Sequence, residues 1–178
     1  MKKIIPILLL VFVSLFAFSC DNNDDNNTAP YEDNDTIAVA YDINNASFTR
    51  INSNLYRYTN VFNTPLVQSD VVLIYMQTDT GTGGTPVWRL LPYTYYVGNA
   101  TNDAVDYAFD FSKNDIAIYV NSTLNLDSTA NATYYTNKRF RVVIVPANTG
   151  KNSGVDYNDY NSVIKFYNIN ESKITVKN

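Results

Sequence analysis

The stretch VDYAFDFSKNDIAIYV, residues 105–120, decides the fold class of this chain. Its first half alternates apolar residues with small or acidic ones, the apolar set being Val105, Tyr107, Phe109 and Phe111. The same spacing of two returns at Ile116, Ile118 and Val120. A period of two predicts extended strands with one buried face and one solvated face. The polar residues 112–115 between the two halves predict a tight hairpin turn.

The strand pattern continues on both sides of this hairpin. Apolar residues also alternate in residues 37–43 and 140–144. Residues 71–76 are apolar without interruption, which predicts a central strand covered on both faces. Residues 78–86, TDTGTGGTP, predict a loop between two strands, because glycine adopts positive φ angles at little cost. The whole pattern predicts a mainly β fold, an antiparallel β-sandwich of immunoglobulin-like or related type, in one domain of residues 36–178.

The end of the chain has a different periodicity. Aromatic and aliphatic residues recur there at spacings of three and four, at Tyr157, Tyr160, Ile164 and Tyr167. Asp156 precedes them as a candidate helix cap, so one short helix over residues 157–168 is predicted. A strand stays open as the alternative, because Ile164 and Phe166 also alternate.

Residues 1–19 have the features of an export signal. Lys2 and Lys3 precede an apolar run that is shorter than the roughly 20 residues needed to span a membrane. Cys20, the only cysteine, follows Ser19 directly and resembles the lipobox cysteine of bacterial lipoproteins. This resemblance implies cleavage before Cys20 and fatty acids such as palmitate on its sulfur, which anchor the chain to a membrane. The alternative is an ordinary signal peptide with an incidental cysteine.

Residues 20–35 predict an acidic, flexible tether. After the cysteine the segment reads DNNDDNNTAPYEDND, which has too little apolar surface to offset the entropy of ordering. Acidic residues at this position resemble the signal that sends Bacteroidota lipoproteins to the outer face of the outer membrane. The predicted location is therefore the outer membrane, lipid-anchored and facing the cell surface. A solubilising spacer on a periplasmic lipoprotein is the alternative.

The charge of the chain argues against nucleic acid as a partner. The formal net charge is −4, and cleavage of the signal removes Lys2 and Lys3 but no acid. An acidic protein without a basic block has no electrostatic attraction for phosphates. The densest basic group, Lys138, Arg139 and Arg141, is predicted to be a solvated strand face.

The composition also limits the chemistry. The chain has no histidine and its one thiol is predicted to be acylated, so histidine-dependent nucleophilic sites and thiolate or histidine metal sites are not expected, and neither is a cofactor. A non-catalytic binding or structural role is predicted, with a glycan or another envelope protein as partner. A glycoside hydrolase with two carboxylates is the less favoured alternative. The acidic residues 156–159 predict a turn, because they lack the spacing and the glycine of an EF-hand calcium loop.

Aromatic residues after the glycine-rich loop are the best candidates for ligand binding, namely Trp88, Tyr93, Tyr95 and Tyr96. Exposed rings stack on sugar faces while neighbouring polar groups bind hydroxyls. Pro92 predicts that this stretch is an edge or bulged strand, where rings stay accessible. The alternative is that the rings pack the sandwich and its rim.

Two hydroxyl residues are candidate modification sites. Thr36 and Ser128 each follow an aspartate in a triplet that resembles the short O-glycosylation signal of Bacteroidota.

The chain resembles a group of uncharacterised small lipoproteins of flavobacteria. The segments that carry the resemblance are VVLIYMQ from Val71, PVWRLLPYTYY from Pro86, VDYAFDFSKNDIAIYV from Val105, RFRVVIVPA from Arg139 and VDYNDYNSVIKFYNINESKI from Val155. Lipidation of Cys20 is the one residue role that the resemblance implies. Members of the group often carry a collagen-like Gly-Pro-Pro stretch after the cysteine, which this chain lacks. Some are labelled dihydrolipoamide dehydrogenases, an activity not predicted here because the chain lacks a dinucleotide fingerprint and a cysteine pair.

Overall fold

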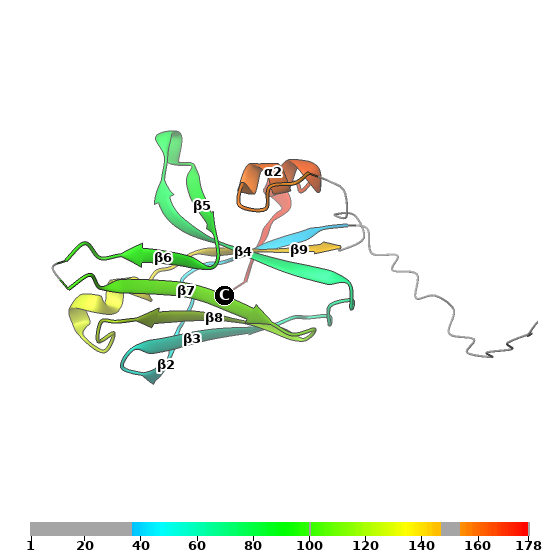
Figure 1. Ribbon diagram of the computed structural model, residues 1–178. Helices are drawn as coiled ribbons and strands as arrows, with labels where there is room; N and C mark the ends of the chain where they lie inside the picture. The colour runs from blue at the N-terminus through cyan, green and yellow to red at the C-terminus, as the bar shows by residue number, and fades with distance from the viewer. Residues whose placement is uncertain (1–36, 100, 147–153, 178) are drawn as a thin grey trace, which may run out of the picture. The chain divides into compact units, whose positions relative to one another are not determined.

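The strands pair into two five-stranded sheets in the computed structural model, which describes residues 37–99, 101–146 and 154–177 (Figure 1). The first sheet has the order β10-β1-β9-β4-β5, formed by β10 (Thr175–Lys177), β1 (Val39–Ile43), β9 (Phe140–Pro146), β4 (Asp70–Thr80) and β5 (Pro86–Leu90). The second has the order β2-β3-β8-β7-β6, formed by β2 (Thr49–Asn52), β3 (Leu55–Val61), β8 (Asp115–Ser122), β7 (Ala104–Phe111) and β6 (Tyr93–Tyr96). Neighbouring strands are antiparallel except β1 and β10, which run parallel. The fold is therefore mainly β and consistent with the predicted sandwich.

The stretch that decided the fold class forms the β7–β8 hairpin. Phe111 pairs with Ile116 across the turn, and the amide of Ser112 donates to the carbonyl of Asp115 at 2.9 Å. Ile116, Ile118 and Val120 of β8 are fully buried between the sheets, while the apolar residues of β7 become more exposed toward Phe111. The predicted hairpin is confirmed, and so is its buried face except at Phe111, which is exposed.

The first sheet is covered on both faces. Val72, Ile74 and Met76 of β4 pack in the core between the sheets. Leu73 and Tyr75 point the other way, into a second apolar cluster with Val163. The interpretation of residues 71–76 as a strand covered on both sides is confirmed from Val72 onward, whereas Val71 is exposed.

The helix that covers the outer face is α2 (Tyr160–Phe166), seen above β4 and β9 in Figure 1. A helix was predicted here, but it begins later and ends earlier than expected. The cap is Asp159, whose side chain accepts from the Asn161 amide, and not Asp156. Asp156 instead accepts from the Asn158 amide at 2.9 Å, in a turn that precedes the helix. The 3₁₀ turn η5 (Glu171–Lys173) then leads into β10.

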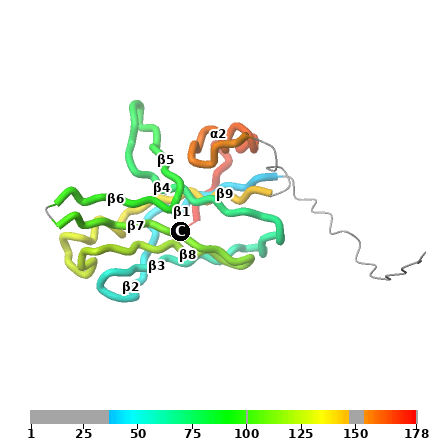
Figure 2. The backbone as a smooth tube through the Cα atoms, viewed as in Figure 1, coloured from blue at the N-terminus to red at the C-terminus, as the bar shows by residue number. Residues whose placement is uncertain are grey.

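The chain passes from one sheet to the other between β5 and β6. Figure 2 shows the trace leaving β5 and entering β6 through this short corner, which contains the cis bond between Leu91 and Pro92. Both strands lie at sheet edges, as Pro92 predicted. The loop between β4 and β5 is shorter than predicted, residues 81–85 with the 3₁₀ turn η2 (Thr82–Gly84), and Gly83 and Gly84 have φ angles of +74° and +81°.

Three predicted features lie outside the described residues: the signal peptide of residues 1–19, the lipidation site Cys20 with its tether of residues 20–35, and Thr36. Across the described residues, none of the helices combines the length and the apolar character that crossing a bilayer requires.

Candidate functional site

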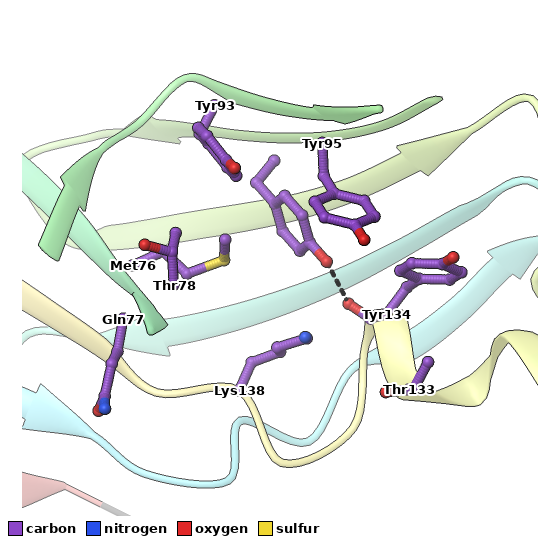
Figure 3. Close-up of a pocket in the computed structure, with 9 residues that line it drawn as sticks. Met76, Gln77, Thr78, Tyr93, Tyr95, Thr133, Tyr134 and Lys138 are labelled. Carbon is purple, nitrogen blue, oxygen red and sulfur yellow. Dashed lines mark hydrogen bonds between the residues drawn. The ribbon is translucent and has the colours of Figure 1, made fainter. Parts of the chain in front are cut away.

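A pocket opens between the two sheets on the side of β6. Its walls come from the end of β4, from β6 and β7, from the 3₁₀ turn η3 (Thr129–Tyr134) and from the residues before β9 (Figure 3). It encloses about 330 Å³, at the lower end of the range of small-molecule sites. We call it the tyrosine pocket; its described lining residues are Met76, Gln77, Thr78, Tyr93, Tyr95, Tyr107, Thr133, Tyr134 and Lys138.

Strand pairing brings the tyrosines of this pocket together. Tyr93 and Tyr95 are two residues apart in β6 and therefore face the same side of the sheet. Tyr93 pairs with Tyr107 of β7, and their rings are near parallel, with centroids 6.5 Å apart and planes at 23°. Tyr95 faces Tyr134 of η3, with ring centroids 6.0 Å apart and planes at 45°.

The Tyr107 hydroxyl fixes the far wall of the pocket. It donates to the main-chain carbonyl of Tyr134 at 2.8 Å, the bond drawn in Figure 3. Burial raises the pKa of Tyr107 well above its usual value, so the hydroxyl stays a donor. This bond ties η3 to the sheet and sets the Tyr134 ring beside Tyr95.

Three other hydroxyls of the tyrosine pocket have no hydrogen-bond partner among the described residues. The hydroxyls of Tyr93, Tyr95 and Tyr134 form no hydrogen bond with any described residue. Unpaired hydroxyls beside accessible ring faces can bind the hydroxyls of a ligand while the rings pack against its apolar faces.

Lys138 is the charged residue of the tyrosine pocket. Its side chain is half-buried, and the Nζ atom lies 6.0 Å from the centroid of the Tyr107 ring. Its amine points toward the rings of Tyr95 and Tyr134 in Figure 3. Burial lowers the pKa of Lys138, because the ammonium is partly removed from water and no described carboxylate pairs with it.

The four aromatic residues predicted to bind a ligand are divided between three places. Tyr93 and Tyr95 line the tyrosine pocket, whereas Tyr96 is 74 % exposed and does not line it. Trp88 of β5 lies on the outer face of the first sheet, against Tyr160 of α2 at 5.7 Å between ring centroids. The predicted set therefore does not form one platform.

Trp88 instead covers a cluster of buried charges. The Arg141 guanidinium lies 4.6 Å from the centroid of the Trp88 rings, and that of Arg139 lies 5.2 Å from it. Arg141 donates to Asp42 through Nε at 2.6 Å and Nη2 at 3.0 Å, and to Glu171 at 2.8 Å. The Tyr160 hydroxyl accepts from Arg141.

The prediction of a solvated basic face is wrong for Arg141, which is 6 % exposed. Asp42, on the face of β1 that was expected to be wet, is 2 % exposed. Burial alone would raise the pKa of Asp42, but hydrogen bonds and charges from Arg141 and Arg139 outweigh it and hold the pKa below its usual value. The reason for this burial is the C-terminal segment, because α2 and η5 cover the outer face of the sheet.

A second cleft, of about 660 Å³, lies between β5 and α2 and contains three carboxylates, those of Asp156, Asp159 and Glu171. Each of them accepts a hydrogen bond within the chain: Asp156 and Asp159 from backbone amides, and Glu171 from Arg141. Their observed contacts are therefore structural. Among the described residues, no group of three histidine, cysteine or acidic side chains is arranged to hold a metal ion.

Ser128, the described candidate for O-glycosylation, is exposed and directly precedes η3. Its neighbour Asp127 accepts two hydrogen bonds from Arg50, both at 2.7 Å, so the Asp-Ser-Thr triplet lies in an ordered surface turn.

Sequence reasoning did not single out Tyr107, Tyr134 or Lys138 as ligand-binding residues. Tyr107 carried only the alternating pattern of a core position, and nothing local placed Tyr134 or Lys138 beside β6.

Comparison of the chain with protein-family models, curated proteins and solved structures found no match in any of the three.

Proposed function

We propose that this protein is a lipid-anchored, extracytoplasmic binding protein that takes a saccharide in the tyrosine pocket, without catalysing a reaction. The observation that carries the ligand class is the convergence of four tyrosines, Tyr93, Tyr95, Tyr107 and Tyr134, on one small pocket. Tyrosine combines a flat apolar ring with a polar hydroxyl, which matches the alternation of C–H faces and hydroxyls on a sugar ring.

The pocket is suited to binding more than to hydrolysis. Its described lining residues include hydroxyls, an amide and an ammonium but no carboxylate. Glycoside hydrolysis by the usual route needs two carboxyl groups about 5 to 10 Å apart. The carboxylates of the second cleft are engaged in holding α2, its preceding turn and Arg141. A bound sugar in the tyrosine pocket would therefore be held and released unchanged.

Membrane anchorage rests on the order of features at the start of the sequence. The basic residues, the apolar run and Cys20 follow one another as in lipoprotein signals, and the acidic tether would hold the domain away from the outer membrane surface. Metabolic labelling with radioactive palmitate tests this part of the proposal. We expect label on the protein and none on the Cys20→Ser variant, and an unlabelled wild-type protein would refute the anchor.

A glycan array probed with the full chain in detergent tests the ligand class. We expect binding to a defined group of saccharides and its loss in Tyr95→Ala, which removes a ring from the pocket. Tyr96→Ala is the matched control, because the neighbouring tyrosine of the same strand does not line the pocket. Equal binding by both variants, or no saccharide binding by the wild type, would refute the proposal.

A further inference from the structure

The charge of the tyrosine pocket indicates the class of its ligand more specifically than the shape of the pocket does. Of the described residues that line it, Lys138 alone is charged at neutral pH. The rest are tyrosines, threonines, a glutamine and a methionine. The pocket therefore presents one positive charge in a chain whose net charge is −4.

The ammonium of Lys138 has no counter-ion among the residues that the structure describes. None of the ion pairs formed by the described residues includes Lys138, and its Nζ atom makes no hydrogen bond with them. The two arginines that follow it closely in the chain, Arg139 and Arg141, both pair with Asp42. A charge that is half removed from water without a partner costs stability, which a bound anion would offset.

The backbone holds this lysine at the pocket. Its carbonyl accepts from the amide of Ala46 at 3.2 Å, and the next residues, Arg139 and Phe140, lead directly into β9. The Nζ atom lies near the Tyr107 ring, on the side of the pocket that the rings of Tyr95 and Tyr134 also face (Figure 3). A ligand that packs on those rings would therefore lie within reach of the ammonium.

We infer that the saccharide bound in the tyrosine pocket is acidic, with a carboxylate on the sugar that pairs with Lys138. This inference rests on the proposed function and narrows its ligand to one chemical class. Hydrogen bonds between an ammonium and a carboxylate are stronger than those between neutral groups, so the charge would set the preference while the tyrosines supply the contact area. Because the chain as a whole is acidic, the preference comes from this contact and not from long-range attraction.

The test compares matched acidic and neutral saccharides on one array and by calorimetry, with sialyllactose against lactose and oligogalacturonate against galacto-oligosaccharide as probes. At least one acidic member is expected to bind about ten- to a hundredfold more tightly than its neutral partner, the factor expected for a charged hydrogen bond. Lys138→Met keeps the length and apolar stem of the side chain and should abolish this preference. Lys113→Met, in the exposed β7–β8 turn, should leave it unchanged.

The outcomes separate the two proposals. Equal affinity for acidic and neutral partners, lost in Tyr95→Ala but retained in Lys138→Met, would overturn the acidic ligand and leave the saccharide pocket standing. No binding of any saccharide by the wild type would overturn both. Circular dichroism of Lys138→Met, compared with the wild type, shows that a lost preference does not come from unfolding.

Discussion

Replacement of Asp42 by asparagine tests whether the buried charge cluster holds the outer face of the first sheet together. Asp42 accepts from Arg141 at 2.6 and 3.0 Å and from Arg139 at 2.5 Å. The amide keeps one acceptor oxygen but turns a donor toward the guanidinium groups, which leaves Arg141 buried without its main counter-charge. Breaking a buried pair in this way costs about 3–5 kcal/mol. Glu171 still contacts Arg141 and compensates part of its charge, so we expect the lower end of this range, about 3 kcal/mol. The compensation is only partial because the Glu171 side chain is 53 % exposed.

Urea unfolding followed by tryptophan fluorescence measures this loss. Trp88 is the only tryptophan, and it lies against Arg141, so its emission reports the cluster directly. A loss of about 3 kcal/mol lowers the urea midpoint by about 1–3 M for usual denaturant slopes. The control is Asp127→Asn, which breaks the exposed pair with Arg50 and should change the midpoint little. A midpoint for Asp42→Asn equal to that of the control would refute the reasoning.

The stability that Asp42→Asn loses relative to the wild type should depend on pH. The pKa of Asp42 is lowered in the folded protein, so the carboxylate stabilises the fold above the unfolded value of 3.8. That contribution disappears as the pH falls through the lower folded value. The difference in unfolding free energy between wild type and Asp42→Asn should therefore be constant from pH 7 to 5 and should disappear as the pH falls below about 4.

Three further changes have expected outcomes. Lys138→Met should raise the melting temperature at pH 7, because burial lowers the pKa of this lysine and penalises its charged form. The difference in melting temperature between variant and wild type should shrink as the pH rises through the folded pKa toward the unfolded value of 10.5. An unchanged melting temperature would contradict this. Ile118→Ala, fully buried in β8, should cost about 2–5 kcal/mol in urea unfolding, against little effect for the exposed Val61→Ala. Tyr107→Phe should cost about 1 kcal/mol by the same assay, because the Tyr134 carbonyl loses its donor, and a neutral result would mean that water replaces the hydroxyl.

Much of the fold could be predicted because strand alternation is a local property. The pattern in residues 105–120 requires only that one face of each strand meets an apolar core, and the β7–β8 hairpin forms as expected. The glycine-rich connection and the uninterrupted apolar strand β4 were predictable for similar local reasons. The helix was correct in kind, but Asp156 and Asp159 are both good caps, and the sequence did not distinguish them.

The candidate site could be predicted only in part. Tyr93 and Tyr95 were identified as aromatic residues that follow the glycine-rich loop and lie close to Pro92, and both line the pocket. Trp88 satisfied the same criteria but faces α2, because β5 belongs to the other sheet. Whether an aromatic residue near a chain corner points to one sheet or the other depends on strand pairing, which composition does not encode.

Chain composition and short-range pattern were enough for the β architecture, for the lack of histidine chemistry and for the expectation of a lipid anchor, because each depends on residue types or spacings within a few positions. Long-range pairing was needed to bury Asp42 against Arg141, 99 residues away, and to bring Lys138 beside Tyr95 and Tyr107. Burial and electrostatic partners depend on which distant segments cover a strand. A charged residue in an alternating strand therefore looks solvated until the element that covers it is known.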